Sequence, residues 1–337
     1  MNLAIADYLL EKEDVASIGS IRPRLSHFQD FMDATGRQDL LCADVDEIVI
    51  DQFRRWSAKV PVIEGSVTRE RSPGTTEASV RSLSAVINAA HRRRETPFPA
   101  AFTALPPSVV SRTPDYRADL KTIAAMFRYC LHPEAPEGEV WSDKAIQRQK
   151  LHRQALLRFL QISVATWCRP DAAHEFSTAP DRGQWISAAQ VVHLNPRGRA
   201  QTKKYRPSVP VPAKFARLLD AVDGPFVPVG SVRKAFEAML DHLKLPRDRE
   251  TGLKLIRRSV STIARPRIGE ERWRQGEIML GHAKASTSDL YALFDPANLG
   301  VALAATTAII DEIEALCPGA FTGAAPELKL VSGGRNG

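Results

Sequence analysis

The segment Leu280–Tyr291 contains a Gly-His pair that is followed, nine residues after the histidine, by a tyrosine. A tyrosine phenol surrounded by positive charge can act as a nucleophile, and a nearby histidine can donate a hydrogen bond to an anionic substrate. The structural alternative is that Gly281 ends a helix and Tyr291 is an ordinary surface residue. Other residues of the chain have to discriminate between these interpretations.

A run of positive charge lies upstream of this segment. Such a run is unfavourable through self-repulsion unless an anion lies over it, although a solvated basic turn is the alternative. The whole chain has a net charge of +7, which favours a polyanionic partner without proving one. Residues 197–217 include seven basic residues and no acid: Arg197, Arg199, Lys203, Lys204, Arg206, Lys214 and Arg217.

Further motifs stand in a fixed order along the second half of the chain. An arginine, Arg169, follows a long apolar helix pattern over residues 143–166, and the basic turn Gln201–Arg206 lies between two short strand patterns. A Lys-x-x-Arg box, Lys254 to Arg257, then opens another helix pattern. In this order, and with the Gly-His pair and the tyrosine at their spacing, the motifs resemble the signature of the tyrosine recombinase (phage integrase) family.

The resemblance implies a site-specific DNA recombinase or integrase that cleaves and rejoins DNA through a 3′-phosphotyrosine intermediate. Such a recombinase would integrate, excise or transpose a mobile element. It also implies which residues perform the catalysis. These candidate catalytic residues are Arg169, Lys203, Lys254, Arg257, His282 and Tyr291, with Lys204 as the reserve for Lys203.

The implied roles agree with the chemistry of phosphodiester transfer. Arginine forks such as Arg169 and Arg257 would donate planar, permanently charged contacts to the non-bridging oxygens, and His282 and Lys254 would add further bonds. Lys203 would protonate the leaving 5′-oxygen, while Tyr291 attacks phosphorus. Rejoining needs no ATP and the arginines replace a metal, so we expect no cofactor and no metal.

Two positions depart from the family pattern. The family usually has an acid three residues after the first arginine, where this chain has Ala172; the nearest acids are Asp171 and Glu175. Lys254 stands where the family usually has histidine, and lysine shuttles protons less readily near neutral pH. These departures keep a different class open, a DNA-binding integrase-like protein without cleavage activity. A type IB topoisomerase-like enzyme is another alternative.

The predicted fold class is mainly α with a small β-hairpin or sheet. Helix patterns at 5–33, 44–58 and from about 75 predict a helical first domain over residues 1–102, and a proline-rich linker spans 103–115. The resemblance identifies this domain with the family's helical core-binding (SAM-like) domain. It identifies residues 116–317 with the catalytic domain of tyrosine recombinases. Residues 318–337 are predicted to form a flexible tail.

Partners follow from the same reasoning. We expect double-stranded DNA as the ligand and, from the resemblance, a homotetramer on paired DNA sites. No apolar run is long enough to cross a membrane and no signal peptide is recognisable, so a cytoplasmic, nucleoid-associated protein is expected. Four widely spaced cysteines exclude a zinc-ligand pair and a redox pair.

The pattern after Tyr291 predicts a last amphipathic helix over residues 297–316. Its apolar face has two interpretations. The face packs on its own catalytic domain, or, as the family resemblance implies, it docks onto a neighbouring subunit and links cleavage to assembly.

Overall fold

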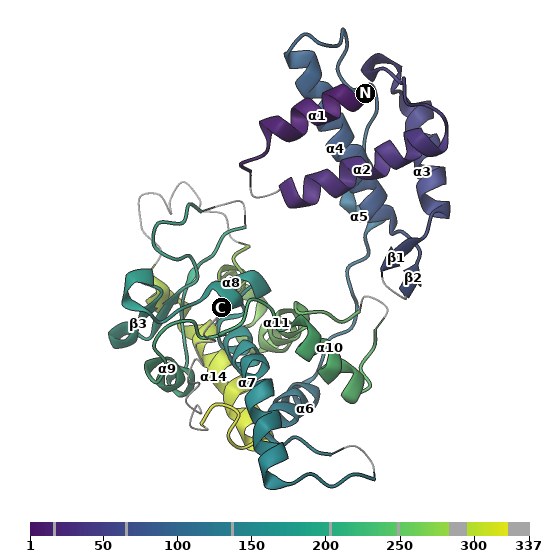
Figure 1. The fold of residues 1–337 in the computed structure, drawn as a ribbon. Helices are drawn as coiled ribbons and strands as arrows, with labels where there is room; N and C mark the ends of the chain where they lie inside the picture. The colour runs from purple at the N-terminus through teal and green to yellow at the C-terminus, as the bar shows by residue number, and fades with distance from the viewer. Residues whose placement is uncertain are drawn as a thin grey trace, which may run out of the picture. The chain divides into compact units, whose positions relative to one another are not determined.

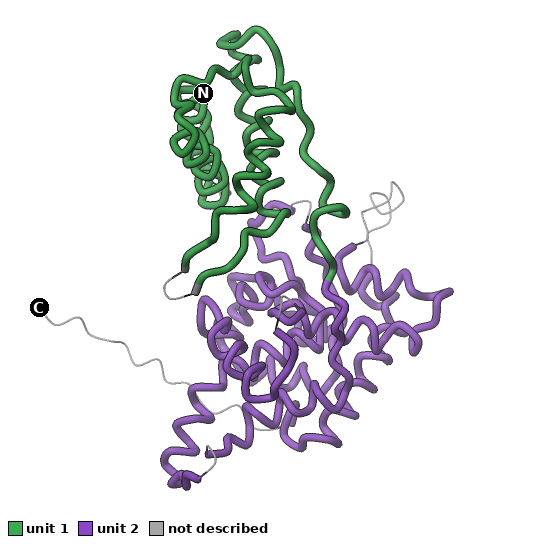
Figure 2. The backbone as a smooth tube through the Cα atoms, turned by 90° about the vertical axis from the view of Figure 1, so that its right-hand side faces the viewer, with its two compact units in different colours: residues 1–113 green, residues 114–337 purple. Residues whose placement is uncertain are grey.

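The structure, a computed structural model, describes residues 1–15, 18–64, 67–135, 138–201, 204–247, 250–282 and 295–322. The chain forms two compact units, residues 1–113 and 114–337 (Figure 2). Both units are mainly helical and each contains one small antiparallel sheet, which confirms the predicted mainly α class. None of the described helices is long and apolar enough to cross a membrane.

The first unit packs its helices around a cluster of aromatic rings. Phe28 on one helix contacts Phe53 on another, with ring centroids 5.3 Å apart in an edge-to-face arrangement, and Phe31 lies beside both. The predicted helix 5–33 is in fact two helices, and two short antiparallel strands in this unit were not predicted. The elements are α1 (Asn2–Glu11), α2 (Ile18–Ala34), α3 (Glu47–Lys59), β1 (Val62–Glu64), β2 (Val67–Arg69), α4 (Pro73–Arg92) and α5 (Pro107–Val110) (Figure 1).

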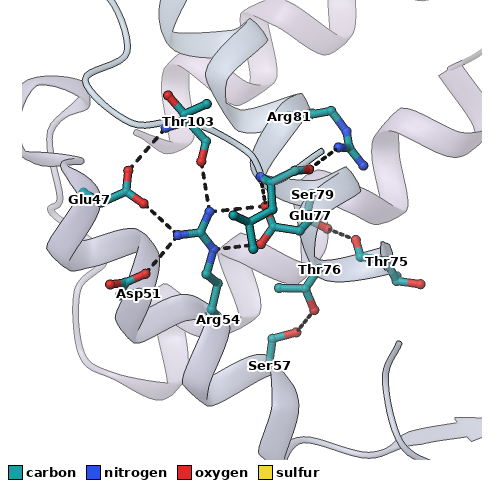
Figure 3. A network of polar contacts seen from close by, with 11 residues as sticks. Glu47, Asp51, Arg54, Ser57, Thr75, Thr76, Glu77, Ser79, Arg81 and Thr103 are labelled. Atoms are coloured by element: carbon teal, nitrogen blue, oxygen red, sulfur yellow. Dashed lines mark hydrogen bonds and ion pairs between the residues drawn. The ribbon is translucent and has the colours of Figure 1, made fainter. Parts of the chain in front are cut away.

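A buried ion pair fixes the start of the proline-rich segment to this unit. The guanidinium of Arg54 on α3 donates to both carboxylate oxygens of Glu77 on α4, at 2.7 and 3.2 Å (Figure 3). Arg54 also donates to the Thr103 carbonyl at 3.0 Å, and Glu77 accepts the Leu105 N–H at 2.7 Å. Because Glu77 is only 2% exposed, these contacts replace the water that its carboxylate would otherwise require.

The second unit is organised around α7, whose C-terminal half is buried on every side. Helices α6, α11 and α14 pack against it. The predicted helix 143–166 is confirmed to the residue. The elements are α6 (Leu120–Leu131), α7 (Asp143–Thr166), α8 (Pro170–Glu175), β3 (Trp185–Ile186), β4 (Val191–His193), β5 (Ser208–Pro210), α9 (Ala213–Asp220), α10 (Arg233–His242), α11 (Leu255–Ile268), α12 (Arg274–Met279) and α14 (Gly300–Leu316) (Figure 1).

The three strands of this unit form an antiparallel sheet in the order β3-β4-β5. Val192 of β4 lies opposite Val209 of β5, and both side chains are fully buried. This pairing fixes the two ends of the long connection between β4 and β5. In sequence, this connection contains the first five basic residues of the run, including the turn that was predicted to lie between two strands.

Helix α14 packs within its own unit. Ile309, Ile310 and Ile313 are all fully buried, and the helix lies against α6, α7 and α11. The trans-docking interpretation of this apolar face is therefore wrong for the chain as the structure shows it, because no large part of the face is left to bury. Packing also continues past residue 317, where the sequence prediction ended the domain: Phe321 is 1% exposed and its N–H donates to Glu314 at 2.7 Å.

Candidate active site

Arg169 owes its position to a sharp turn at the end of α7. Trp167 ends the helix in the left-handed conformation, with φ of 54°, and Pro170 then opens α8. Arg169 is extended between them and half-buried. Its Nη1 donates to the Tyr205 carbonyl at 2.7 Å, and its Nη2 donates to the Gly281 carbonyl at 3.3 Å.

Arg257 lies in the first turn of α11, and its guanidinium, like that of Arg169, donates to a backbone carbonyl of residues 280–281. The residue is 9% exposed. Its Nη1 donates to the Trp167 carbonyl at 2.8 Å, and its Nη2 donates to the Leu280 carbonyl. Residues 280–281 thus supply a carbonyl to each guanidinium. The second carbonyl belongs to Tyr205 for Arg169 and to Trp167, at the end of α7, for Arg257.

Gly281 and His282 follow α12 in the conformation that commonly ends helices. The His282 N–H donates to the Glu277 carbonyl at 2.9 Å and the Gly281 N–H to the Ile278 carbonyl at 2.8 Å, with φ of 59° at Gly281. The helix-end interpretation of Gly281 is therefore confirmed. It coexists with a second requirement for glycine, because a Cβ atom there would lie 2.5 Å from the Tyr205 carbonyl oxygen.

The His282 ring belongs to the same cluster. Its Nε2 lies 3.1 Å from Nη2 of Arg257. Because a guanidinium only donates, Nε2 accepts, and the ring is neutral with its proton on Nδ1. Burial, together with the charges of Arg257 and Arg169, lowers the pKa of His282.

The guanidiniums of Arg169 and Arg257 lie close enough for each charge to affect the other. Burial and the nearby charge of Arg169 lower the pKa of Arg257 to about 10, so it stays charged at neutral pH. Over the described ranges, neither Arg169 nor Arg257 pairs with a carboxylate; their hydrogen bonds go to carbonyls and to His282. Each guanidinium has more N–H donors than these bonds use. The arrangement suits an anion with several acceptor oxygens.

The acids near Arg169 have another partner. Asp171 and Glu175 of α8 bind Arg206, at 3.0 and 2.5 Å, and not the candidate catalytic arginine. Arg206 was identified from the sequence only as part of the basic run. No pattern in the sequence pairs Arg206 with Asp171 and Glu175, which lie 35 and 31 residues before it.

The structure shows less of the remaining candidates. Tyr291 and Lys203 lie outside the described residues. Lys254 immediately precedes α11, three residues before Arg257, and is exposed. In the part of the chain that the structure describes, no three His, Cys, Asp or Glu side chains are grouped as metal ligands.

Comparison with known proteins gives similarity at the level of structure alone. No family model and no curated protein matches the sequence. A crystal structure of the XerH site-specific recombinase bound to palindromic difH substrate, in a post-cleavage complex, is similar with a TM-score of 0.49 and 17% identity, covering 85% of this chain and 78% of that one. A pre-cleavage complex of XerH with difH substrate is similar with a TM-score of 0.46 and 15% identity, over the same shares of the two chains.

Proposed function

We propose that this protein is a tyrosine-type site-specific recombinase that cleaves and rejoins double-stranded DNA. The observation that carries the proposal is the pair of guanidiniums of Arg169 and Arg257, which bind no carboxylate among the described residues and are oriented by backbone carbonyls beside the His282 ring. During transfer the phosphodiester gains negative charge, and two guanidiniums that are already held in position can stabilise that charge without rearranging. An acid-paired structural arginine would lack this property.

In the proposed reaction, the Tyr291 phenolate attacks phosphorus and the bond from phosphorus to the 5′-oxygen breaks. Arg169, Arg257 and His282 donate to the non-bridging oxygens. The Lys203 ammonium gives its proton to the leaving 5′-oxygen and becomes a neutral amine. The 3′-phosphotyrosine bond resembles the bond that was broken, so attack by a 5′-hydroxyl reverses the step and joins the strands.

The proposed partner is double-stranded DNA, bound by the basic run over residues 197–217 apart from Arg199, Arg206 and Lys214, which form ion pairs with acids. The proposed assembly is a homotetramer on two paired sites, which mass photometry with one-site and two-site duplexes measures directly. Such an assembly requires a contact between subunits other than the face of α14 that is already buried.

The experiment that tests the cleavage proposal is covalent trapping. A library of nicked duplexes with randomised sequence is incubated with the protein, and adducts are separated on denaturing gels, which also recovers the cleaved sequence. Wild-type protein is expected to form an adduct, and Tyr291→Phe to form none while still shifting DNA in native gels. Tyr129→Phe, on α6, is the matched control and should form the adduct normally.

A second candidate function is DNA binding without cleavage. The lysine at position 254, exposed and standing where the family usually has histidine, favours it. The same trapping experiment separates the two functions, because a non-cleaving protein shifts DNA in native gels and gives no adduct with the wild-type chain.

A further inference from the structure

Arg206 is a buried arginine whose charge is neutralised. Its side chain is 4% exposed, whereas those of its partners, Asp171 and Glu175, are 51% and 37% exposed. Burial would raise the pKa of the Asp171 carboxyl, but the hydrogen bond and charge of Arg206 hold it below its ordinary value. With two acids on its guanidinium, Arg206 has little charge to offer a phosphate. Its role must differ from that of Arg169 and Arg257.

The contacts of Arg206 fasten one end of the basic turn to α8. The side-chain amide of Gln201 closes the same turn: its Nε2 donates to the Arg206 carbonyl at 2.9 Å, and its Oε1 accepts the Arg206 N–H at 3.3 Å. The preceding residue, Tyr205, offers its carbonyl to Arg169. The turn 201–206 is therefore joined at its base and anchored both to α8 and to a candidate catalytic arginine.

Chain geometry makes this anchor relevant to Lys203. Lys203 lies three positions before Arg206 in sequence, so at most about 11 Å of extended chain joins them. Lys203 itself lies outside the described residues. The nearest described residue before it, Gln201, is joined to Arg206 by the hydrogen bonds given above.

We propose that Arg206, held by Asp171 and Glu175, is a positioning residue: it attaches the described end of the basic turn to α8, next to the Tyr205 carbonyl that Arg169 binds, and the proton transfer proposed for Lys203 depends on that attachment. The inference rests on the proposed function. It also gives the Ala172 departure a physical meaning, since the acids of α8 flank position 172 and support the turn through Arg206 instead of supporting Arg169.

The test uses the leaving group. Cleavage of an ordinary phosphodiester needs a proton on the departing 5′-oxygen, whereas a 5′-bridging phosphorothiolate releases a thiolate that needs none. Arg206→Ala is expected to lower adduct formation on ordinary DNA by at least about 100-fold, the size expected for loss of a general acid. On the phosphorothiolate of the same recovered sequence it should approach the wild-type rate, as Lys203→Ala should.

Two controls separate positioning from other effects. Arg169→Ala should be as slow on the phosphorothiolate as on ordinary DNA, because its loss removes charge stabilisation and not the proton. Arg267→Ala removes another arginine and its ion pair, to Glu312 at 2.6 Å between α11 and α14, and should cleave both substrates normally.

Folding is checked independently with a milder variant. Asp171→Asn removes one half-exposed partner of Arg206 and leaves Glu175, so the fold should survive while a smaller defect, again rescued by the phosphorothiolate, remains. If Lys203→Ala is rescued and neither Arg206→Ala nor Asp171→Asn is, the positioning role is refuted while the proposed function stands. If wild-type protein forms no adduct, the proposed function itself fails.

Discussion

The Nη1 atom of Arg257 lies 2.8 Å from the carbonyl oxygen of Trp167, the residue that ends α7 in the left-handed conformation. That conformation costs a residue with a side chain roughly 1–2 kcal/mol. The cost is met by packing, because the Trp167 ring is fully buried and stacks on Trp273, with centroids 6.4 Å apart. The strained turn thus fixes Arg257 through its carbonyl and places Arg169 two residues further on.

Arg257→Ala is expected to abolish detectable cleavage, a loss of at least about 100-fold, because it removes a preorganised donor to the transferring phosphoryl group. It should also lower stability by roughly 1–3 kcal/mol, since the Trp167 and Leu280 carbonyls lose their buried partner. Arg257→Lys should recover stability in part and cleavage poorly, because an ammonium cannot bridge both carbonyls. Urea unfolding and adduct formation measure the two effects separately, and normal cleavage by Arg257→Ala would exclude a phosphate role.

Gly281→Ala is expected to damage the site through backbone displacement. The new Cβ atom would lie 2.5 Å from the Tyr205 carbonyl oxygen and 3.4 Å from Nη1 of Arg169, at a φ that favours glycine. Adduct formation should fall by at least about tenfold, as expected when a reacting group is misplaced. Gly300→Ala, at the start of α14 with open space around it, is the matched control and should cleave normally. Equal activity of the two variants would contradict the packing described for Gly281.

The pKa of His282 should lie below its ordinary value and rise when Arg257 is replaced by alanine, because the charge of Arg257 helps to lower it. A lowered pKa means that the unfolded chain binds the proton more readily than the folded protein. The contribution of this group to stability is therefore present above about pH 6.5, the ordinary histidine pKa, and is lost as the pH falls below it. NMR titration of the ring protons, assigned with His282→Gln, measures both effects. An unchanged pKa in Arg257→Ala would refute the contact.

Ile310→Ala on α14 should lower the free energy of unfolding by roughly 2–5 kcal/mol, the cost of removing a fully buried isoleucine side chain. Deletion of all residues from 299 onward should leave unit 2 unable to fold, because it removes a helix that packs on α6, α7 and α11. Circular dichroism and thermal unfolding test both variants. A truncated chain that stays folded as a monomer would instead restore the trans-docking interpretation.

Periodic patterns predicted most of the second unit. Both ends of α7 were predicted correctly, because Ser142 caps the start of the helix and Pro170 prevents the helix from continuing. The prediction of one helix over residues 5–33 was wrong. The chain breaks around residues 12–15, where neither glycine nor proline signals the end of a helix. The β1–β2 hairpin was missed because its strands are short, with polar residues and a proline nearby, which reads as loop.

The residues of the candidate site could be predicted from the sequence, but the contacts that hold their side chains in place could not. The resemblance of the motifs to the family signature selected Arg169, Arg257 and His282, which the structure brings together. Sequence reasoning could not find that backbone carbonyls hold the guanidiniums, because a carbonyl leaves no trace in the residue type. Nor could it pair Arg206 with acids more than thirty residues away, a contact that only the tertiary fold creates.

The absence of carboxylate partners for Arg169 and Arg257 among the described residues has a consequence for every stability measurement on this protein. Adjacent like charges destabilise the empty folded state, and any anion that binds only the folded chain shifts the unfolding equilibrium by mass action. Melting temperatures in phosphate or sulfate buffers are therefore expected to exceed those in chloride at equal ionic strength. Variants that neutralise the cluster should lose this dependence on the buffer anion, so their stability relative to wild type will change sign or size with the choice of buffer.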